Sequence, residues 1–290
     1  MVLTIDGLQQ NYYMIANFIF RKIFDEIQFH SRSTRYLTRD EFRALRRYYS
    51  SWMKSSLDEF HGHYFARRIK NAVKLIIESR GGTKPNVLDC GCGFGSESIA
   101  FGLLGAKVFG VDLSTERINV ARKRLNYYDD RYADKLDVNF KNTNILDCKF
   151  DELFDMVYAK EFITHVYSVS KFVKFAKRVL KSNGHLIITD ANPLNPAVYY
   201  KAWRAHEYGL YTVVADPRTG KDVPYAVERL VSPFYLKSLL RQNDFEPRSD
   251  FYGIPPVPSN LVWIIKPFEA KVNFPFLAIY EVIAMKHSVL

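Results

Sequence analysis

Between residues 86 and 190, short runs of apolar residues alternate with longer stretches in which apolar positions recur every three or four residues. Short apolar runs bounded by turn residues predict buried strands, and the wider spacing predicts amphipathic helices. Strands are expected at 86–90, 107–112, 138–143, 154–160 and 184–190. Helices are expected at 95–104, 114–127 and 168–181, with Gly184 marking the end of the last one. This alternation is typical of a parallel sheet with helices on both faces.

The chain before this region has a helical pattern, because its apolar residues recur at helical spacing. Thr38, followed three residues later by Glu41, predicts a capping box at the start of one helix. Gly81 and Gly82 end the pattern. We therefore expect a helical cap at 1–82 and a sheet domain at 83–290.

Residues 192–231 interrupt the alternation with prolines and tyrosines, and we expect an insertion there. Ser232 followed by Pro233 predicts the start of a further helix, because proline is favoured at the first helical position. Two final strands are expected near 245–252 and 276–286. They bring the predicted strands to seven.

The segment VLDCGCGFGSES combines a predicted strand, three glycines and the start of a helix. At Gly91, Gly93 and Gly95 the backbone is able to turn sharply and to lie close to a ligand. A dinucleotide fingerprint has its third glycine five residues after the first, whereas here it comes four residues after. Asp89 stands two residues before the first glycine. The spacing argues against a dinucleotide, and an ordinary strand-to-helix turn is the alternative.

Asp112 ends the second predicted strand, about twenty residues after the first glycine. An acidic residue at this place accepts hydrogen bonds from the hydroxyls of a bound ribose. The alternative is that Asp112 caps the helix that begins near Ser114. The spacing favours the ligand contact.

Together, these residues resemble two motifs of the class I S-adenosylmethionine-dependent methyltransferases. Asp89 and the glycines resemble motif I, and Asp112 with Leu113 resembles motif II. Family members carry an acid after the third strand that binds the adenine amino group. This chain departs from that pattern with Asn144 and Ile145, although an asparagine oxygen also accepts hydrogen bonds. The stretch FDMVYAKEFITHV resembles motif IV, and the whole resemblance is good over residues 85–190 and loose in the tail.

The resemblance implies an α/β fold with a Rossmann-like, doubly wound, seven-stranded and mostly parallel sheet. The last strand of the sheet is antiparallel. An N-terminal helical cap precedes the sheet, and an insertion follows its fifth strand. The implied methyl donor is S-adenosylmethionine. The residues implied to bind it are Asp89, Gly91, Gly93, Gly95, Asp112, Leu113, Asn144, Ile145, Ala159, Lys160 and Phe162.

The implied reaction is methyl transfer to a small molecule, because the tail is similar to that of family members in sugar, lipid or secondary-metabolite biosynthesis. The expected acceptor is a hydroxyl oxygen of a natural product, sugar or lipid-linked intermediate. His165 is the first candidate for the general base, since imidazole exchanges protons near neutral pH; alternatively it only shapes the pocket. Glu161 is the second candidate, with a solvated glutamate as the alternative.

The insertion at 192–231 is expected to cover the substrate. Its aromatic and imidazole side chains either line the acceptor pocket or pack in the core: Tyr199, Tyr200, Trp203 and His206. In the cap, His61, His63, Tyr64, Arg67 and Arg68 lie on helical stripes. Either Arg67 or Arg68 binds the carboxylate of the donor, or both belong to a solvated basic face.

The formal net charge is +10, but the basic residues are scattered in pairs and triplets such as Arg122–Arg124. This is typical of solvated helix faces, and no known nucleic-acid-binding motif accompanies them. We expect no specific nucleic-acid partner. The alternatives are methylation of RNA or another macromolecule, then a nicotinamide-dependent oxidoreductase and a non-catalytic binding module.

Three cysteines, Cys90, Cys92 and Cys148, are too few for a disulfide framework and lack metal-ligand spacing. We expect no metal and a reducing, cytoplasmic location. The aromatic stretch YYMIANFIF at 12–20 either packs in the cap or makes a peripheral contact with an anionic membrane. The expected assembly is a monomer or a homodimer.

Overall fold

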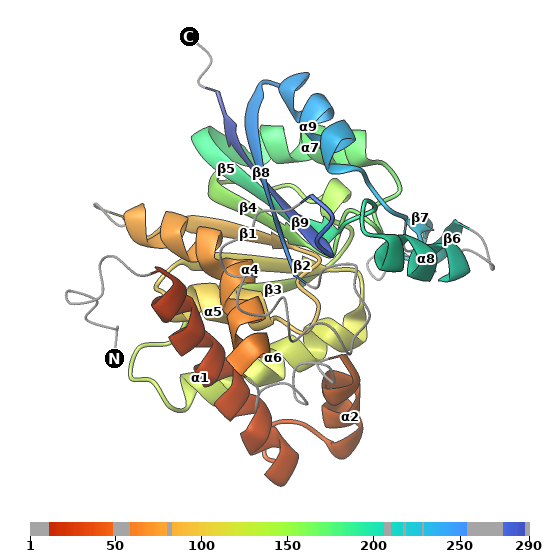
Figure 1. Ribbon diagram of the computed structural model, residues 1–290. Helices are drawn as coiled ribbons and strands as arrows, with labels where there is room; N and C mark the ends of the chain where they lie inside the picture. The colour runs from red at the N-terminus through yellow and green to blue at the C-terminus, as the bar shows by residue number, and fades with distance from the viewer. Residues whose placement is uncertain are drawn as a thin grey trace. The chain divides into compact units, whose positions relative to one another are not determined.

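The structure is a computed structural model that describes the following residues (Figure 1): 12–48, 59–79, 83–205, 210–216, 219–227, 229–253 and 275–287. The chain divides into two compact units, residues 1–142 and residues 143–290, and each is described by itself.

The sheet of the first unit has parallel strands in the order β3-β2-β1. The strands are β1 Asn86–Cys90, β2 Lys107–Asp112 and β3 Val138–Asn142. Parallel neighbours need a crossover connection, and α5 Ser96–Leu103 and α6 Thr115–Asp129 provide the two crossovers. The sequence predicts β1 and β2 to the residue, and β3 ends one residue earlier than expected.

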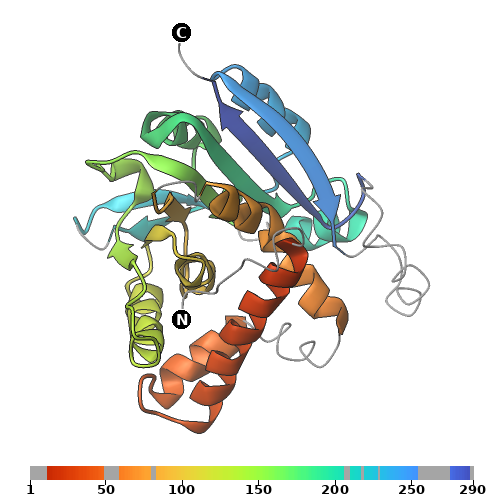
Figure 2. The ribbon, with the colours of Figure 1, turned by 90° about the vertical axis from the view of Figure 1, so that its left-hand side faces the viewer.

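Helices α1 Tyr12–Arg32, α2 Arg39–Tyr48 and α4 Glu59–Glu78 precede this sheet. α1 packs along α4 (Figure 2). An apolar cluster joins α1 and α2 to the glycine segment, α6 and β3; its members include Ile23, Ile27, Phe42, Leu45, Phe94, Ile118 and Phe140. Burial of these side chains fixes the N-terminal helices against the segment that follows β1. The domain boundary at residue 82 stays a prediction.

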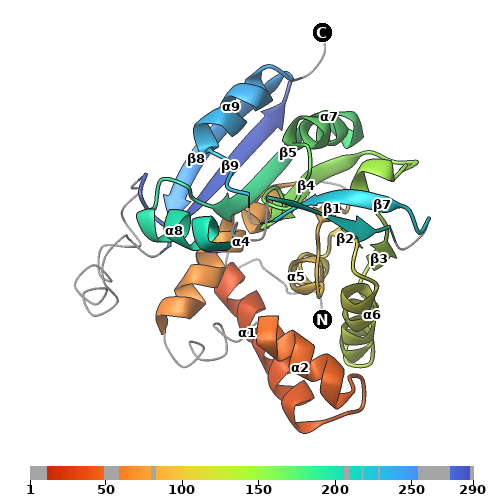
Figure 3. The ribbon, with the colours of Figure 1, turned by 90° about the vertical axis from the view of Figure 1, so that its right-hand side faces the viewer.

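The second unit contains strands in the order β4-β5-β9-β8 (Figure 3). They are β4 Phe154–Lys160, β5 Leu180–Ala191, β8 Phe245–Tyr252 and β9 Ile279–Lys286. β9 is antiparallel to both of its neighbours. The strand order of the sheet is β3-β2-β1-β4-β5-β9-β8, which confirms the predicted seven-stranded, mostly parallel arrangement with an antiparallel last strand.

Two helices of this unit follow the prediction, with one difference at the end of the first. α7 Val169–Val179 and α9 Pro233–Arg241 both pack on the strands. The expectation that a helix runs to residue 181 and ends at Gly184 is wrong. β5 already begins at Leu180, and Gly184 lies inside it, beside a shift of register between Phe154 and Met156 of β4. Gly184 therefore marks a bulge in the strand and does not mark the end of a helix.

The predicted insertion forms α8 Pro196–Ala205 and a hairpin of β6 Tyr211–Ala215 and β7 Asp222–Ala226. The hairpin is bonded to the segment after β4, because the Ala226 amide donates to the His165 carbonyl at 3.0 Å. The Arg229 guanidinium donates to the carbonyls of Val166 and Tyr167. None of the described helices is long and apolar enough to cross a bilayer.

The predicted capping box at the start of α2 is confirmed, since the Glu41 amide donates to Thr38 Oγ1 and the Thr38 amide donates to Glu41 Oε2. We expect Thr38→Ala to lower the free energy of unfolding by about 1 kcal/mol. Ser232, which precedes α9 without a side-chain capping bond, is the matched control. Ser232→Ala should cost less than about 0.5 kcal/mol. Urea unfolding monitored by circular dichroism measures both, and equal losses would contradict the assignment.

Candidate functional site

The turn after β1 is bonded to the end of β2. The amides of Gly91 and Cys92 both donate to the Val111 carbonyl, at 2.7 and 3.1 Å, and the Gly95 amide donates to the Cys92 carbonyl at 2.9 Å. The backbone of this turn is therefore fixed by its neighbouring strand before any ligand is considered.

Gly93 and Gly95 serve different purposes in the turn. Both have positive φ angles, 54° and 80°. A Cβ built at Gly95 would lie 2.6 Å from the Phe140 ring and 3.0 Å from Ala121 Cβ, so the third glycine allows α5 to pack closely. A Cβ built at Gly93 would meet no heavy atom of the described residues within 4 Å. Gly93 is buried, but the space beside its Cα holds no described atom and could take a group of a ligand, whereas the space at Gly95 is filled.

Two carboxylates flank the turn. Asp89 is buried and its Oδ2 accepts a hydrogen bond from Ser98 Oγ at 2.6 Å, which connects β1 to the first turns of α5. Asp112 is half-buried at the end of β2; its Oδ2 accepts from the Gly93 amide at 2.9 Å and its Oδ1 from the Ser114 amide at 2.8 Å. A carboxylate has about four acceptor positions, so each oxygen of Asp112 keeps one for a ligand hydroxyl.

Asn142, which the sequence analysis missed, fixes the corner that carries Asp112. Its side-chain nitrogen donates to the carbonyls of Asp112 and Leu113, both at 3.0 Å, and its oxygen accepts from Thr115 Oγ1. Leu113 is half-buried beside the carboxylate. The only sequence signal for Asn142 is its place at the end of β3, next to the end of β2 in a parallel sheet.

Cys92 lies in the turn as a buried thiol. Burial raises its pKa well above the ordinary value, and the nearby carboxylates of Asp89 and Asp112 raise it further. The thiol therefore stays protonated at neutral pH and is a poor nucleophile. Among the described residues there is no group of three histidine, cysteine or acidic side chains placed to bind a metal.

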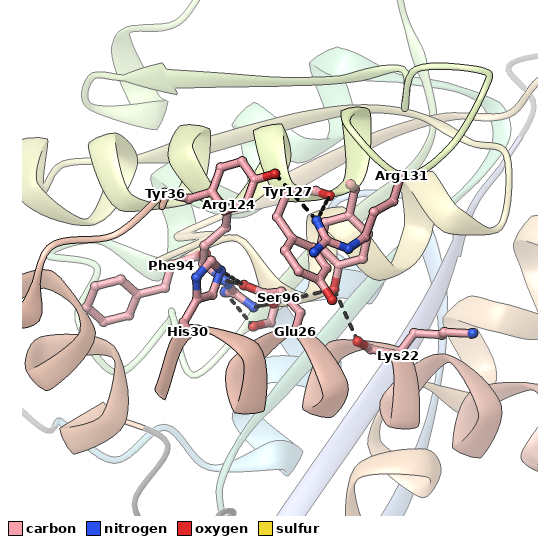
Figure 4. Close-up of polar contacts among 10 residues, drawn as sticks. Lys22, Glu26, His30, Tyr36, Phe94, Ser96, Arg124, Tyr127 and Arg131 are labelled. Atoms are coloured by element: carbon pink, nitrogen blue, oxygen red, sulfur yellow. Dashed lines mark hydrogen bonds and ion pairs between the residues drawn. The ribbon is translucent and has the colours of Figure 1, made fainter. Parts of the chain in front are cut away.

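The basic residues at 122–124 are predicted to lie on a solvated helix face. This prediction is wrong for Arg124, which is fully buried. Its guanidinium donates to the Phe94 carbonyl and to Ser96 Oγ, on the two sides of Gly95, and to Glu26 of α1 (Figure 4). Arg68 is also buried, so the solvated-face alternative is wrong for it as well. The side chains of His61, His63 and Tyr64 lie outside the described residues.

In the second unit, Asn144 and Ile145 begin a short 3₁₀ helix, residues 145–147. Asn144 Oδ1 accepts from the Leu146 amide at 3.1 Å, and its nitrogen donates to Asp147 Oδ2. Asn144 is therefore a capping residue whose oxygen has one acceptor position left, and Ile145 is buried. Adenine contacts at these two residues stay predictions.

The end of β4 brings several predicted residues onto one short segment. Ala159 and Lys160 are buried at the end of the strand. Glu161 has a positive φ of 48° and an exposed side chain, and its amide donates to the Thr189 carbonyl at 2.7 Å. Phe162 packs against Phe172 of α7, with ring centroids 5.1 Å apart. The strained backbone at Glu161 turns the chain sharply out of the sheet.

His165 lies one turn further on and is oriented by the hairpin. Its Nδ1 is 3.2 Å from the Ala226 carbonyl oxygen, and its ring stacks on Tyr225 at 5.0 Å with 13° between the planes. A carbonyl oxygen only accepts, so this contact favours a proton on Nδ1 and leaves Nε2 as the basic nitrogen. The imidazole is half-buried, and a proton on Nδ1 leaves Nε2 available to act as a general base.

Other residues of this unit have different environments. Asp190 is buried and accepts from the amides of Ala191 and Thr164, so it stabilises the segment that carries His165. Tyr199, Tyr200 and Trp203 of α8 are 57–63% exposed, which contradicts packing in the core. His206 lies outside the described residues.

Comparisons with known proteins agree with this geometry. Residues 88–188 match a family described as "Methyltransferase domain". Over 162 residues the chain is 32% identical to the mitochondrial ubiquinone biosynthesis O-methyltransferase of Mus musculus, a match that covers 54% of this chain and 40% of that protein. The comparisons thus support a methyltransferase domain at residues 88–188.

Solved structures support the fold of the methyltransferase domain. An S-adenosylmethionine-dependent methyltransferase of Clostridium acetobutylicum has a TM-score of 0.53 at 14% identity, covering 85% of this chain and 99% of that one. Another, of Archaeoglobus fulgidus, has a TM-score of 0.51 at 18% identity, covering 76% and 92%. The chain spans less than half the length of these mammalian relatives, 40–45% of each.

The two glycines give a matched pair of variants. We expect Gly95→Ala to lower the free energy of unfolding by at least about 2 kcal/mol, from ~1–2 kcal/mol for the left-handed backbone and ~1–3 kcal/mol for the overlap with Phe140. Gly93→Ala should lose only the first contribution, because its Cβ meets no described atom. Urea unfolding measures both. A loss at Gly93 as large as that at Gly95 would show that packing does not distinguish the two glycines.

Proposed function

We propose that the chain is a methyltransferase that transfers the methyl group of S-adenosylmethionine to a hydroxyl oxygen of a small molecule. The observation that carries the proposal is the Asp112 carboxylate, which accepts from the Gly93 amide and keeps an acceptor position on each oxygen. This pairing suits an adenosyl group, whose ribose donates two hydroxyls. The O-methyltransferase names of the curated relatives support oxygen as the methylated atom.

The turn and the end of β2 are the part of the donor site that is best defined. In the proposal, Asp112 binds the ribose and Leu113 packs beside it, while Gly91 and Gly93 bring backbone against the donor. Asp89 acts through Ser98 to fix the start of α5, and Gly95 allows that helix to pack closely. The proposal keeps further donor contacts at Asn144, Ile145, Ala159, Lys160 and Phe162.

For methyl transfer, the protein mainly has to position the acceptor against the donor and remove the proton of the acceptor hydroxyl. S-adenosylmethionine, when bound, supplies a methyl group on a positively charged sulfur. His165 is proposed to accept the proton of the acceptor hydroxyl at Nε2, because the Ala226 carbonyl orients the ring through Nδ1. Glu161 is the second candidate for the base, and its exposed side chain makes it the weaker one. Alignment of acceptor and donor supplies the rest of the rate enhancement.

The acceptor is proposed to be a natural product, a sugar or a lipid-linked intermediate. The insertion at 192–231 is proposed to cover it, supported by the bonds between the hairpin and the His165 segment. The exposed aromatic side chains of α8 are suited to an apolar or ring-shaped acceptor. We further propose a cytoplasmic location, no specific nucleic-acid partner, and a monomeric or homodimeric assembly. A peripheral membrane contact through residues 12–20 stays a prediction.

Isothermal titration with S-adenosylhomocysteine, the demethylated donor, tests the donor site. We expect binding by the wild-type chain and at least about ten-fold weaker binding by Asp112→Asn, because a hydrogen bond to a charged acceptor contributes about 1.5–3 kcal/mol. Titration with NADH is the control for the oxidoreductase alternative and should give no heat of binding. NADH binding without S-adenosylhomocysteine binding would reject the proposal.

Turnover tests the general base. With an acceptor found by screening hydroxylated small molecules for S-adenosylhomocysteine release, His165→Ala should lower kcat by about 10²–10⁴-fold and leave donor affinity unchanged. His165→Gln preserves much of the shape without a basic nitrogen and should be equally slow. If glutamine restores turnover, His165 only shapes the pocket and Glu161 becomes the candidate.

A further inference from the structure

The Arg124 guanidinium is a fully buried group that contacts the glycine turn from the first unit's interior (Figure 4). Its Nη1 donates to the Phe94 carbonyl at 2.7 Å and to Ser96 Oγ at 2.9 Å. These acceptors are the neighbours of Gly95 on either side, so one rigid group fixes the backbone just before and just after the left-handed glycine. Arg124 itself is anchored in α6.

The other side of the guanidinium meets Glu26 of α1 in a two-pronged ion pair. Arg124 Nε donates to Glu26 Oε1 at 2.8 Å and Nη2 to Oε2 at 2.6 Å, and both side chains have no exposed surface. Burial alone would raise the pKa of Glu26. The charge and hydrogen bonds of Arg124, together with His30, outweigh burial and keep that pKa below its usual value. The pair is therefore ionised at neutral pH.

Aromatic residues shield this ion pair from water. His30 Nε2 lies 2.9 Å from Glu26 Oε1, and its ring packs edge-on against Phe29 and Tyr36. Tyr127 packs on His30, and the Arg131 guanidinium lies over the Tyr127 ring at 3.6 Å. Charges buried in this way are screened little by salt, so the contact persists at physiological ionic strength.

A buried ion pair costs desolvation, and an apolar replacement of similar volume is often as stable. The two-pronged geometry of the Arg124–Glu26 pair is therefore better explained by a role in positioning the glycine turn than by a gain in folding stability. Glu26 belongs to a helix that starts far from the turn in sequence, and the Arg124 fork connects that helix to Phe94 and Ser96 by direct hydrogen bonds.

We propose that Arg124 and Glu26 are positioning residues for the methyl donor, which couple the placement of α1 to the shape of the glycine turn and hence to donor affinity. The inference rests on the proposed function, since it assumes that the turn binds the donor. Coupling between two sites is reciprocal, so donor binding must in turn stabilise α1. Whatever moves α1 then changes donor affinity without touching the donor.

Binding measurements on three variants test the coupling. Glu26→Gln keeps the volume of the α1 partner and removes its charge, and Ser96→Ala removes one acceptor on the turn and leaves the ion pair intact. Lys123→Met is the matched control. Lys123 is the neighbour of Arg124 on α6 and pairs with Glu41 of α2 at 2.5 Å, but the pair is partly exposed.

Isothermal titration with S-adenosylhomocysteine should show at least about five-fold weaker binding for Glu26→Gln, the lower end of typical coupling between sites. Ser96→Ala should also weaken binding, and Lys123→Met should not. Hydrogen exchange provides a second readout that is independent of affinity. S-adenosylhomocysteine should slow amide exchange in α1, and Glu26→Gln should abolish that slowing.

The outcomes separate the two proposals. If the wild-type chain binds no S-adenosylhomocysteine, the proposed function fails and the coupling fails with it. If the wild-type chain binds, but Glu26→Gln and Ser96→Ala bind equally well or α1 exchange is unchanged, the coupling alone is overturned. A lower melting temperature of Glu26→Gln with unaltered affinity would likewise show that the pair only stabilises the fold.

Discussion

The hydrogen bond from the Gly93 amide to Asp112 Oδ2 joins the end of β2 to the turn after β1. Together with the two amide bonds to the Val111 carbonyl, it determines where the backbone of the turn lies. The residues around it are arranged to preserve this contact. Asn142 fixes the corner that carries the carboxylate, and Gly95 lets α5 start close to Phe140. The same carboxylate thus organises the turn and faces the position where a ribose is proposed to bind.

The charged groups behind the turn extend this organisation into the interior of the first unit. Among the described residues, Arg124 is one of the largest side chains without exposed surface, and its hydrogen bonds include those to Glu26, Phe94 and Ser96. A guanidinium is suited to this place because its planar fork binds a carboxylate on one edge and other acceptors on another. A lysine has one charged point and is unable to make both contacts with the same geometry.

Much of the sheet and of the turn could be predicted because their signals are local. A run such as Asn86–Cys90 followed by closely spaced glycines carries its own pattern, and Thr38 with Glu41 lies within one helical turn. Arg124 was misread because its partner Glu26 is 98 residues away, and helical spacing does not reveal such a contact. Gly184 was misread because the same residue type ends helices and marks bulges, and only the partner strand decides between them.

Among the described residues, the bonds between the hairpin of the insertion and the His165 segment lie near the end of β7. These contacts include the Ala226 amide, the Tyr225 ring and Arg229, while hydrogen bonds join Asp216 to Thr219, Gly220 and Lys221. The base of the hairpin therefore orients the imidazole, and the bonds that do so lie at its base rather than at its tip. In evolution, such a tip is free to change length and sequence and so to alter which molecules are admitted, while the proton-accepting nitrogen stays in register.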